Sequence, residues 1–199
     1  MSVFNVEFQQ KDMASKIVVS LERISGAFKS LLWNYAKTLG LSPIQIQLLI
    51  FIAYHKNNYC KVSYLAREFN ITRPTISDAI KVLNTKCLIQ KEYSEIDNRS
   101  YTISLTTEGK KIVNTTENFA DPIKDEIKKN DTKNLEILYR SLNQLIYNLN
   151  KKDIITVQRV CYACRFYKKD KRKHYCNLLE KELYTKEIRV DCPEFENKS

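Results

Sequence analysis

The sequence predicts a mainly α-helical protein with one small β-hairpin and a short C-terminal tail in which cysteines gather. Three observations indicate this fold class. Apolar residues recur at steps of three and four over most of the first 150 positions, and two short segments within residues 88–105 alternate between apolar and polar side chains. Four of the six cysteines follow residue 160.

The first long element is a helix predicted over residues 13–39, and Gly40 ends it because glycine adopts the left-handed conformation at low cost. The apolar residues of this helix recur at every third or fourth position, so they share one stripe. The members of the stripe are Ile17, Leu21, Ile24, Phe28, Leu31 and Tyr35.

A second helix is predicted to begin after Ser42, which can cap it, while Pro43 suits the first turn and Gln45 completes a capping box. A short helix over residues 62–69 follows, and Asn70 is suited to a left-handed turn.

The next helix is predicted over residues 73–86, with Thr72 as its N-cap. Its apolar side carries Ile76, Ile80 and Leu83, which we expect in the core. Its other sides are polar and therefore available to a partner.

Residues 88–93 and 101–105 predict two strands, and the polar turn 94–100 joins them into a hairpin. The order of helix, tight turn, helix and hairpin is that of a winged helix-turn-helix. In this arrangement the second helix enters the DNA major groove and the wing reaches the backbone or the minor groove.

Further helices are predicted from residue 107 to 119, again after Asp121-Pro122, and from Asp131 onward. The last one carries a leucine seam at heptad-like spacing. Its members are Leu135, Leu138, Leu142, Leu145 and Leu149. Two long apolar stripes exceed what one winged helix needs to cover, so we expect a homodimer.

The net charge of +10 and the sequence pI near 9.2 favour a polyanionic partner, with nucleic acid as the leading candidate. The three glycines lie far apart, which excludes a glycine-rich phosphate loop. No nucleophile–base pair or carboxylate pair stands out, so we do not expect an enzyme. The N-terminus lacks a secretory pattern and no apolar run is long enough for a membrane span, so we expect a cytoplasmic protein without membrane contact.

The residues from 41 to 112 resemble the winged helix-turn-helix of the MarR family of bacterial transcription regulators. The resemblance is carried by Leu41-Ser42-Pro43, Tyr64-Leu65-Ala66, Thr72-Arg73-Pro74-Thr75-Ile76-Ser77, Asp97-Asn98-Arg99-Ser100 and Leu105-Thr106-Thr107-Glu108-Gly109. It implies an obligate homodimer whose first and last helices interlock and whose two recognition helices address a pseudo-palindromic operator. One departure is Cys87, which stands where the family usually has glycine.

The DNA contacts that this resemblance implies come from the recognition helix 73–86 and the wing 94–100. They are Arg73, Thr75, Ser77, Asp78, Lys81 and Arg99. Independently of the resemblance, the polar and basic residues of the helix are hydrogen-bond donors, and Arg99 stands at the wing tip, where it has little to pack against.

The tail has the cysteine pattern C-x2-C-x11-C-x15-C. Four thiols within one short segment favour a tetrahedral thiolate site formed by Cys161, Cys164, Cys176 and Cys192. Zinc and a [4Fe–4S] cluster both accept four thiolates, and both remain open at this point. His174 is a spare ligand, and we expect the other two cysteines, Cys60 and Cys87, to be buried as small apolar residues.

The sequence thus predicts four parts: an N-terminal dimerisation helix (1–40), a DNA-binding winged helix (41–112), C-terminal dimerisation helices (113–154) and a metal-binding tail (155–199). The predicted function is a homodimeric transcriptional regulator that binds an operator, with a tail that is structural or that senses a small-molecule or redox effector. The alternative is a redox or metal-responsive protein whose tail carries the chemistry and whose winged helix is an interaction scaffold.

Overall fold

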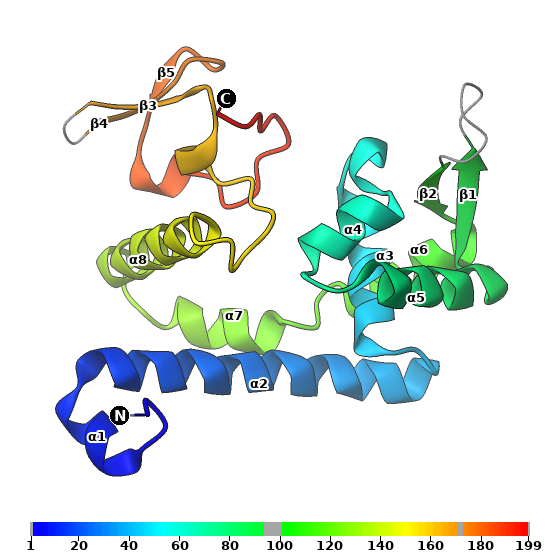
Figure 1. Ribbon diagram of the computed structural model, residues 1–199, viewed down its shortest axis with the longest axis horizontal. Helices are drawn as coiled ribbons and strands as arrows, with labels where there is room; N and C mark the ends of the chain where they lie inside the picture. Colours follow the sequence, from blue (N-terminus) through cyan, green and yellow to red (C-terminus); the bar gives the residue numbers. More distant parts are fainter. Residues whose placement is uncertain (1, 94–100, 171–172, 199) are drawn as a thin grey trace.

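The predicted N-terminal helix is α2 (Met13–Leu39) in a computed structural model that describes residues 2–93, 101–170 and 173–198. Asp12 caps α2 by accepting hydrogen bonds from two backbone N–H groups, and Gly40 ends it with a φ of 61°. A short helix that the sequence did not predict, α1 (Val6–Lys11), precedes it. Figure 1 shows α2 running along nearly the whole length of the molecule.

The winged helix gathers at the C-terminal end of α2 (Figure 1). Its helices and strands lie close to the predicted bounds, and the Ser42–Gln45 capping box is present. The elements are α3 (Pro43–Tyr54), the 3-10 turn η1 (Asn57–Tyr59), α4 (Val62–Glu68), α5 (Arg73–Thr85), β1 (Ile89–Tyr93), β2 (Tyr101–Leu105) and α6 (Thr107–Thr116). The two strands pair antiparallel, from Ile89 opposite Leu105 to Tyr93 opposite Tyr101.

The hydrophobic core of the winged helix lies among α3, α4, α5 and the hairpin. The three predicted core residues of α5, Ile76, Ile80 and Leu83, are at most 1% exposed. Close packing also extends to the backbone, because a Cβ atom on Gly109 would lie 2.0 Å from the carbonyl oxygen of Leu88. Helix α6 can therefore approach the hairpin only with glycine at this position.

Two tight turns of the winged helix use non-glycine residues in the left-handed region. Asn70 has a φ of 53°, as predicted, and Cys87 has a φ of 55°. Cys87 thus takes the left-handed conformation that glycine adopts at lower cost. The prediction that Cys87 is buried is wrong, since its place at the end of a turn leaves the side chain exposed. Cys60 is buried as predicted, and burial raises the pKa of its thiol to about 11.

Two further helices follow the winged helix, α7 (Asp121–Lys128) and α8 (Thr132–Asn150). They lie toward the N-terminal half of α2, opposite the winged helix (Figure 1). Phe119, just before α7, meets Phe28 of α2 with ring centroids 6.3 Å apart. In the described residues no single helix combines the length and hydropathy of a membrane span, although α2 and α3 reach them together as a pair bent by 95°.

The tail folds into a small unit above α8 that contains strands the sequence did not predict (Figure 1). Strands β3 (Tyr167–Asp170), β4 (Lys173–Cys176) and β5 (Lys181–Leu183) form an antiparallel sheet in that order. Two 3-10 turns, η2 (Cys161–Ala163) and η3 (Thr185–Glu187), flank the sheet.

Arg159 fastens this tail to the winged helix. Its side chain is 5% exposed and its guanidinium forms two ion pairs, one with Glu68 of α4 (2.6 Å) and one with Asp191 of the tail (2.5 Å). It also donates a hydrogen bond to the Tyr64 hydroxyl at 2.7 Å and lies 5.6 Å from the centroid of the Phe51 ring. We call Arg159, Glu68, Asp191, Tyr64 and His55 the arginine clasp, because His55 completes the group at 2.9 Å from Asp191.

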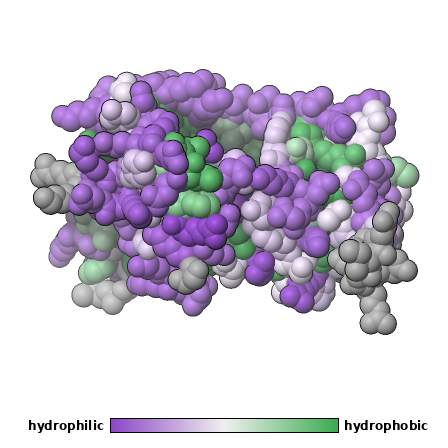
Figure 2. Space-filling view, turned by 90° about the horizontal axis from the view of Figure 1, so that it is seen from above, coloured by the Kyte–Doolittle hydropathy of each residue, from purple (hydrophilic) through white to green (hydrophobic). Residues whose placement is uncertain are grey.

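The charges of the arginine clasp are paired with one another, since Arg159 forms ion pairs with both Glu68 and Asp191. Burial alone would raise the pKa of Asp191, but hydrogen bonds from Arg159 and His55 hold that pKa well below its usual value. Seen from above, the molecular surface is mostly hydrophilic, with separate hydrophobic patches over the tail and over the winged helix (Figure 2).

We expect Arg159→Met to lower the free energy of unfolding by about 2 kcal/mol, because it leaves the Glu68 carboxylate in a largely buried site without a partner. Denaturant titration measures the loss. Lys56→Ala is the matched control, since the Lys56–Glu194 pair also joins the winged helix to the tail but both side chains are 54% exposed. This control should cost less than about 1 kcal/mol. Equal losses in the two variants would contradict the role of the clasp.

Candidate nucleic-acid interface and cysteine cavity

Helix α5 presents one polar face to solvent. The hydroxyl oxygen of Thr72 caps the helix by accepting a hydrogen bond from the backbone N–H of Thr75 at 3.4 Å, and a proline follows in the first turn. Since the apolar side of α5 is buried in the core, the opposite side is directed outward. The five candidate residues on α5 are all exposed, and they are Arg73, Thr75, Ser77, Asp78 and Lys81.

The exposed face of α5 suits a polyanion. Arg73 adds a guanidinium at the helix N-terminus, where the helix dipole also attracts phosphate. A hollow of about 580 Å³ follows along the helix and is lined by Asp78, Lys81, Val82, Thr85 and Lys86. Sequence reasoning missed Thr85 and Lys86, although Thr85 follows Lys81 by four positions and Lys86 follows Val82 by four positions, which is about one helical turn.

The remaining DNA-contact candidate, Arg99, lies outside the described residues, as does the whole turn 94–100. The two strands that carry this turn are described, and they project from the winged helix beside α5 (Figure 1). Lys91 of β1 lies 4.6 Å from the centroid of the Tyr101 ring, which adds a cation to the hairpin.

The four cysteines of the tail surround one small cavity of about 40 Å³. Cys161 begins η2, and Cys164 is the residue that caps its C-terminal end. Cys176 is the last residue of β4, and Cys192 lies near the C-terminus. Cys161 and Cys164 are buried, while Cys176 and Cys192 are half-buried, and all four are free thiols. The fold thus brings together residues that span 32 positions of the sequence.

Arg189 contacts the sulfur atoms of two of these cysteines, Cys161 and Cys192. Its backbone N–H donates to Cys161 Sγ at 3.2 Å, and its guanidinium lies 3.7 Å from Cys192 Sγ. Burial raises the pKa of the Cys161 thiol, and the N–H bond partly opposes that shift. The donor set, four sulfurs and a cation around one cavity, fits a thiolate-bound metal in its chemistry. In the described part of the chain, however, no three His, Cys, Asp or Glu side chains stand in an arrangement that could hold a metal ion.

His174 does not join the cysteines. Its ring packs against Tyr162 and Tyr167, and it lines a separate cavity between the sheet and α8. The prediction of His174 as a spare ligand therefore finds no support in the geometry. Its aromatic neighbours come from two adjoining elements, Tyr162 from η2 and Tyr167 from β3.

Comparison with known proteins gives matches to the winged-helix part. Residues 39–100 match the family model described as MarR family. The HTH-type transcriptional repressor YetL of Bacillus subtilis (strain 168) is 27% identical in a match of 122 aligned positions that covers 55% of this chain and 73% of YetL.

Solved structures with a similar fold are less similar in sequence. The S. aureus MepR–DNA complex has a TM-score of 0.59 at 21% identity, covering 66% of this chain and 97% of MepR. A MarR transcriptional regulator from Methanosarcina mazei Go1 has a TM-score of 0.58 at 19% identity, covering 68% of this chain and 96% of that protein. Residues 39–100 thus match the MarR family in sequence, and the helical part of the chain has the winged-helix fold of these MarR-type regulators.

Proposed function

We propose that the protein is a DNA-binding transcriptional regulator that acts as a homodimer and carries a metal site in its tail. The observation that carries the proposal is the exposed polar face of α5, whose other face is fixed in the core of a MarR-type winged helix. A solved neighbour with this fold, MepR, is in complex with DNA, and a relative in sequence, YetL, is described as a transcriptional repressor.

In the proposed complex α5 lies in the major groove. Arg73 and Lys81 neutralise phosphates or reach base edges, while the hydroxyls of Thr75 and Ser77 supply adaptable donors. Arg99 reaches the flanking minor groove from the wing. Asp78 is the one candidate whose charge opposes phosphate, so it suits a base that offers a donor, such as the amino group of cytosine.

Dimer formation is supported by apolar side chains that the single chain leaves uncovered. On the predicted α2 stripe, Ile17, Ile24 and Phe28 are 51%, 47% and 37% exposed. On the predicted α8 seam, Leu138, Leu142 and Leu145 are 43%, 37% and 39% exposed. Large apolar side chains exposed in a row along a helix are typical of an interface, so we propose that these two helices pack against a second copy.

The cysteine cavity is the proposed metal site, with Cys161, Cys164, Cys176 and Cys192 as ligands. Zinc would cross-link the small tail and stabilise it, and a [4Fe–4S] cluster on the same thiols is the alternative. The metal site would be connected to the winged helix through the arginine clasp. Cys161 is two residues from Arg159 and Cys192 follows Asp191, so a change in thiol spacing would act on the arginine clasp.

Replacing Arg73 or Lys81 with alanine should weaken operator binding about tenfold each and reduce the salt dependence of the affinity by about one ion. Operator DNA is first selected from random sequences and then titrated at several salt concentrations. Lys133→Ala, an exposed cation on α8, is the control and should leave the affinity unchanged. If Arg73→Ala and Lys81→Ala together bind as tightly as the unaltered protein, α5 is not the reading helix.

Leu142→Glu should convert the dimer to a monomer, because it places two buried charges in the proposed interface. Loss of two buried leucines should weaken the dimer by about two to three orders of magnitude. Sedimentation equilibrium measures the association, and Lys133→Glu on the same helix serves as control. A wild-type chain that is monomeric at micromolar concentration would contradict the proposed interface.

Protein prepared without oxygen should contain one metal centre per chain. Colourless protein with one zinc ion supports the zinc site, and brown protein absorbing near 400 nm supports the cluster. Cys164→Ser and Cys192→Ser should each lower the metal content and the unfolding temperature. Cys87→Ser should change neither, since Cys87 is exposed and lies outside the cavity. Metal-free wild-type protein with an unchanged unfolding temperature after chelation would overturn the metal site.

A further inference from the structure

The cysteine cavity leaves more space between its thiols than one metal ion fills. At about 40 Å³ it has room for about three water molecules, since one water needs about 10–15 Å³ by the same measure. A zinc ion contacts each of its four thiolates at about 2.3 Å, so the sulfurs of a zinc site lie about 3.8 Å apart and enclose no such space. The cavity is therefore larger than the site of a single ion.

The four thiols are near one another without converging on one point. Burial is the main cause that raises the pKa of the Cys161 thiol, and the charges of the other three thiols each raise it further. Over the residues that the structure describes, however, no three side chains of His, Cys, Asp or Glu stand in an arrangement that could hold one metal ion. Thiols that share a cavity at a wider spacing match a [4Fe–4S] cluster, in which each thiolate binds a different iron atom.

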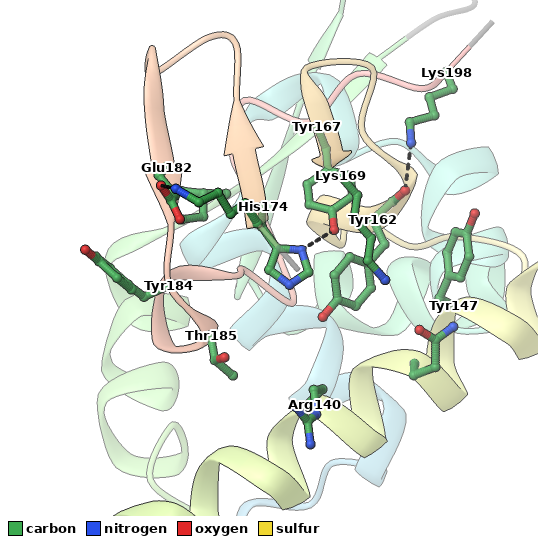
Figure 3. Close-up of a pocket in the computed structure, with 13 residues that line it drawn as sticks. Arg140, Tyr147, Tyr162, Tyr167, Lys169, His174, Glu182, Tyr184, Thr185 and Lys198 are labelled. Carbon is green, nitrogen blue, oxygen red and sulfur yellow. Dashed lines mark hydrogen bonds and ion pairs between the residues drawn. The ribbon is translucent and has the colours of Figure 1, made fainter. Parts of the chain in front are cut away.

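The other donors beside the cavity are engaged elsewhere. The two carboxylates that line it, Glu187 and Glu194, lie 2.6 and 3.0 Å from the ammonium groups of lysines. His174 Nδ1 lies 2.5 Å from the Tyr167 hydroxyl. Figure 3 shows the ring of His174 in the separate cavity between α8 and the sheet. The thiols thus form an all-cysteine set, which is the ordinary ligation of a [4Fe–4S] cluster.

The remaining wall of the cavity is apolar. It is formed by Phe166, Tyr167, Leu178, Leu179 and Leu183. Leu183 and Tyr167 are buried, whereas Leu178 and Leu179 are nearly half exposed. Since the apolar shell of a metal site controls the access of water and with it the reduction potential, one side of this site is shielded and the other is accessible from solvent.

Arg189 brings positive charge to the thiols. Its backbone N–H donates to Cys161 Sγ at 3.2 Å and its carbonyl oxygen accepts from the Cys161 N–H at 3.1 Å, so its backbone is fixed against η2. Its guanidinium lies 3.7 Å from Cys192 Sγ. Hydrogen bonds and positive charge at the sulfurs of a cluster favour its reduced form and raise its reduction potential. Zinc has no redox chemistry, so these contacts could set a potential only for a cluster.

We propose that the four thiols of the cysteine cavity bind a [4Fe–4S] cluster and that Arg189 sets the reduction potential of this cluster. The inference rests on the metal site of the proposed function and names which of its two candidates occupies it. Reduction adds one electron to the cluster and leaves the four iron–thiolate bonds intact. Arg189 acts through the thiolates and binds no iron.

The first test measures iron, acid-labile sulfide and zinc in the full chain after incubation with ferrous iron, sulfide and zinc without oxygen. We expect about four iron and about four sulfide per chain. Cys164→Ser should lose most of both, and Cys87→Ser, outside the cavity, should keep them. One zinc ion per chain without sulfide would overturn the cluster and leave the proposed metal site standing. Protein with no bound metal would overturn both.

The second test measures the potential by spectroelectrochemical titration. Arg189→Met should shift the one-electron equilibrium about tenfold toward the oxidised form, which is about 59 mV to lower potential. Arg189→Lys should restore most of the shift, because it returns the charge. Lys186→Met is the matched control, since it removes an exposed cation of the tail outside the cavity.

Equal potentials in Arg189→Met and Lys186→Met, at equal iron content, would overturn the role of Arg189. An unchanged potential in Arg189→Met together with a shifted one in Lys186→Met would overturn it as well. Circular dichroism confirms that each variant is folded. Neither test uses DNA, so a failure of the proposed DNA function is detected separately by operator titration.

Discussion

The contact on which the arrangement of the chain depends is the ion pair of the buried Arg159 with Glu68 and Asp191. A guanidinium that is 5% exposed is tolerable only where its charge is matched, and here two carboxylates from separate parts of the fold match it. Glu68 ends α4 of the winged helix and Asp191 belongs to the tail. The requirement to neutralise one buried cation therefore fixes the tail against the helix that braces α5.

The clasp also explains why a small, basic tail can have a defined position. Its own core holds five buried apolar or thiol side chains, which gives little hydrophobic stabilisation for a unit of this size. Docking on α3 and α4 adds the Tyr64 hydrogen bond and the contact of the guanidinium with the Phe51 ring. It also adds a hydrogen bond that the Thr156 hydroxyl donates to the Arg67 carbonyl oxygen. The tail thus gains much of its order from the winged helix.

Local signals in the sequence were enough for the winged helix and insufficient for the tail. Ser42, Thr72 and Asp131 predict helix starts through hydrogen bonds within three residues, so the bounds of α3, α5 and α8 were predictable. Strands β3–β5 are three or four residues long and carry no clear alternation. The role of Arg159 depends on partners 91 and 32 positions away, which no local pattern can indicate. The cysteine cavity was predictable because the spacing of four thiols is itself a non-local pattern, whereas the metal-binding geometry remains a prediction.

Helix α8 has more contacts than its leucine periodicity predicts. Its leucine seam predicts one apolar face, yet the helix serves three neighbours. The Tyr139 hydroxyl donates to the Ile188 carbonyl oxygen of the tail, and the buried Asn143 follows one turn later on the same side. Arg140 and Tyr147 line the cavity beside the sheet, while Leu138 and Leu142 remain uncovered. A helix whose faces are divided in this way cannot rotate about its axis without breaking contacts with the tail. The position of the proposed dimer seam is therefore set by the tail as much as by the leucines.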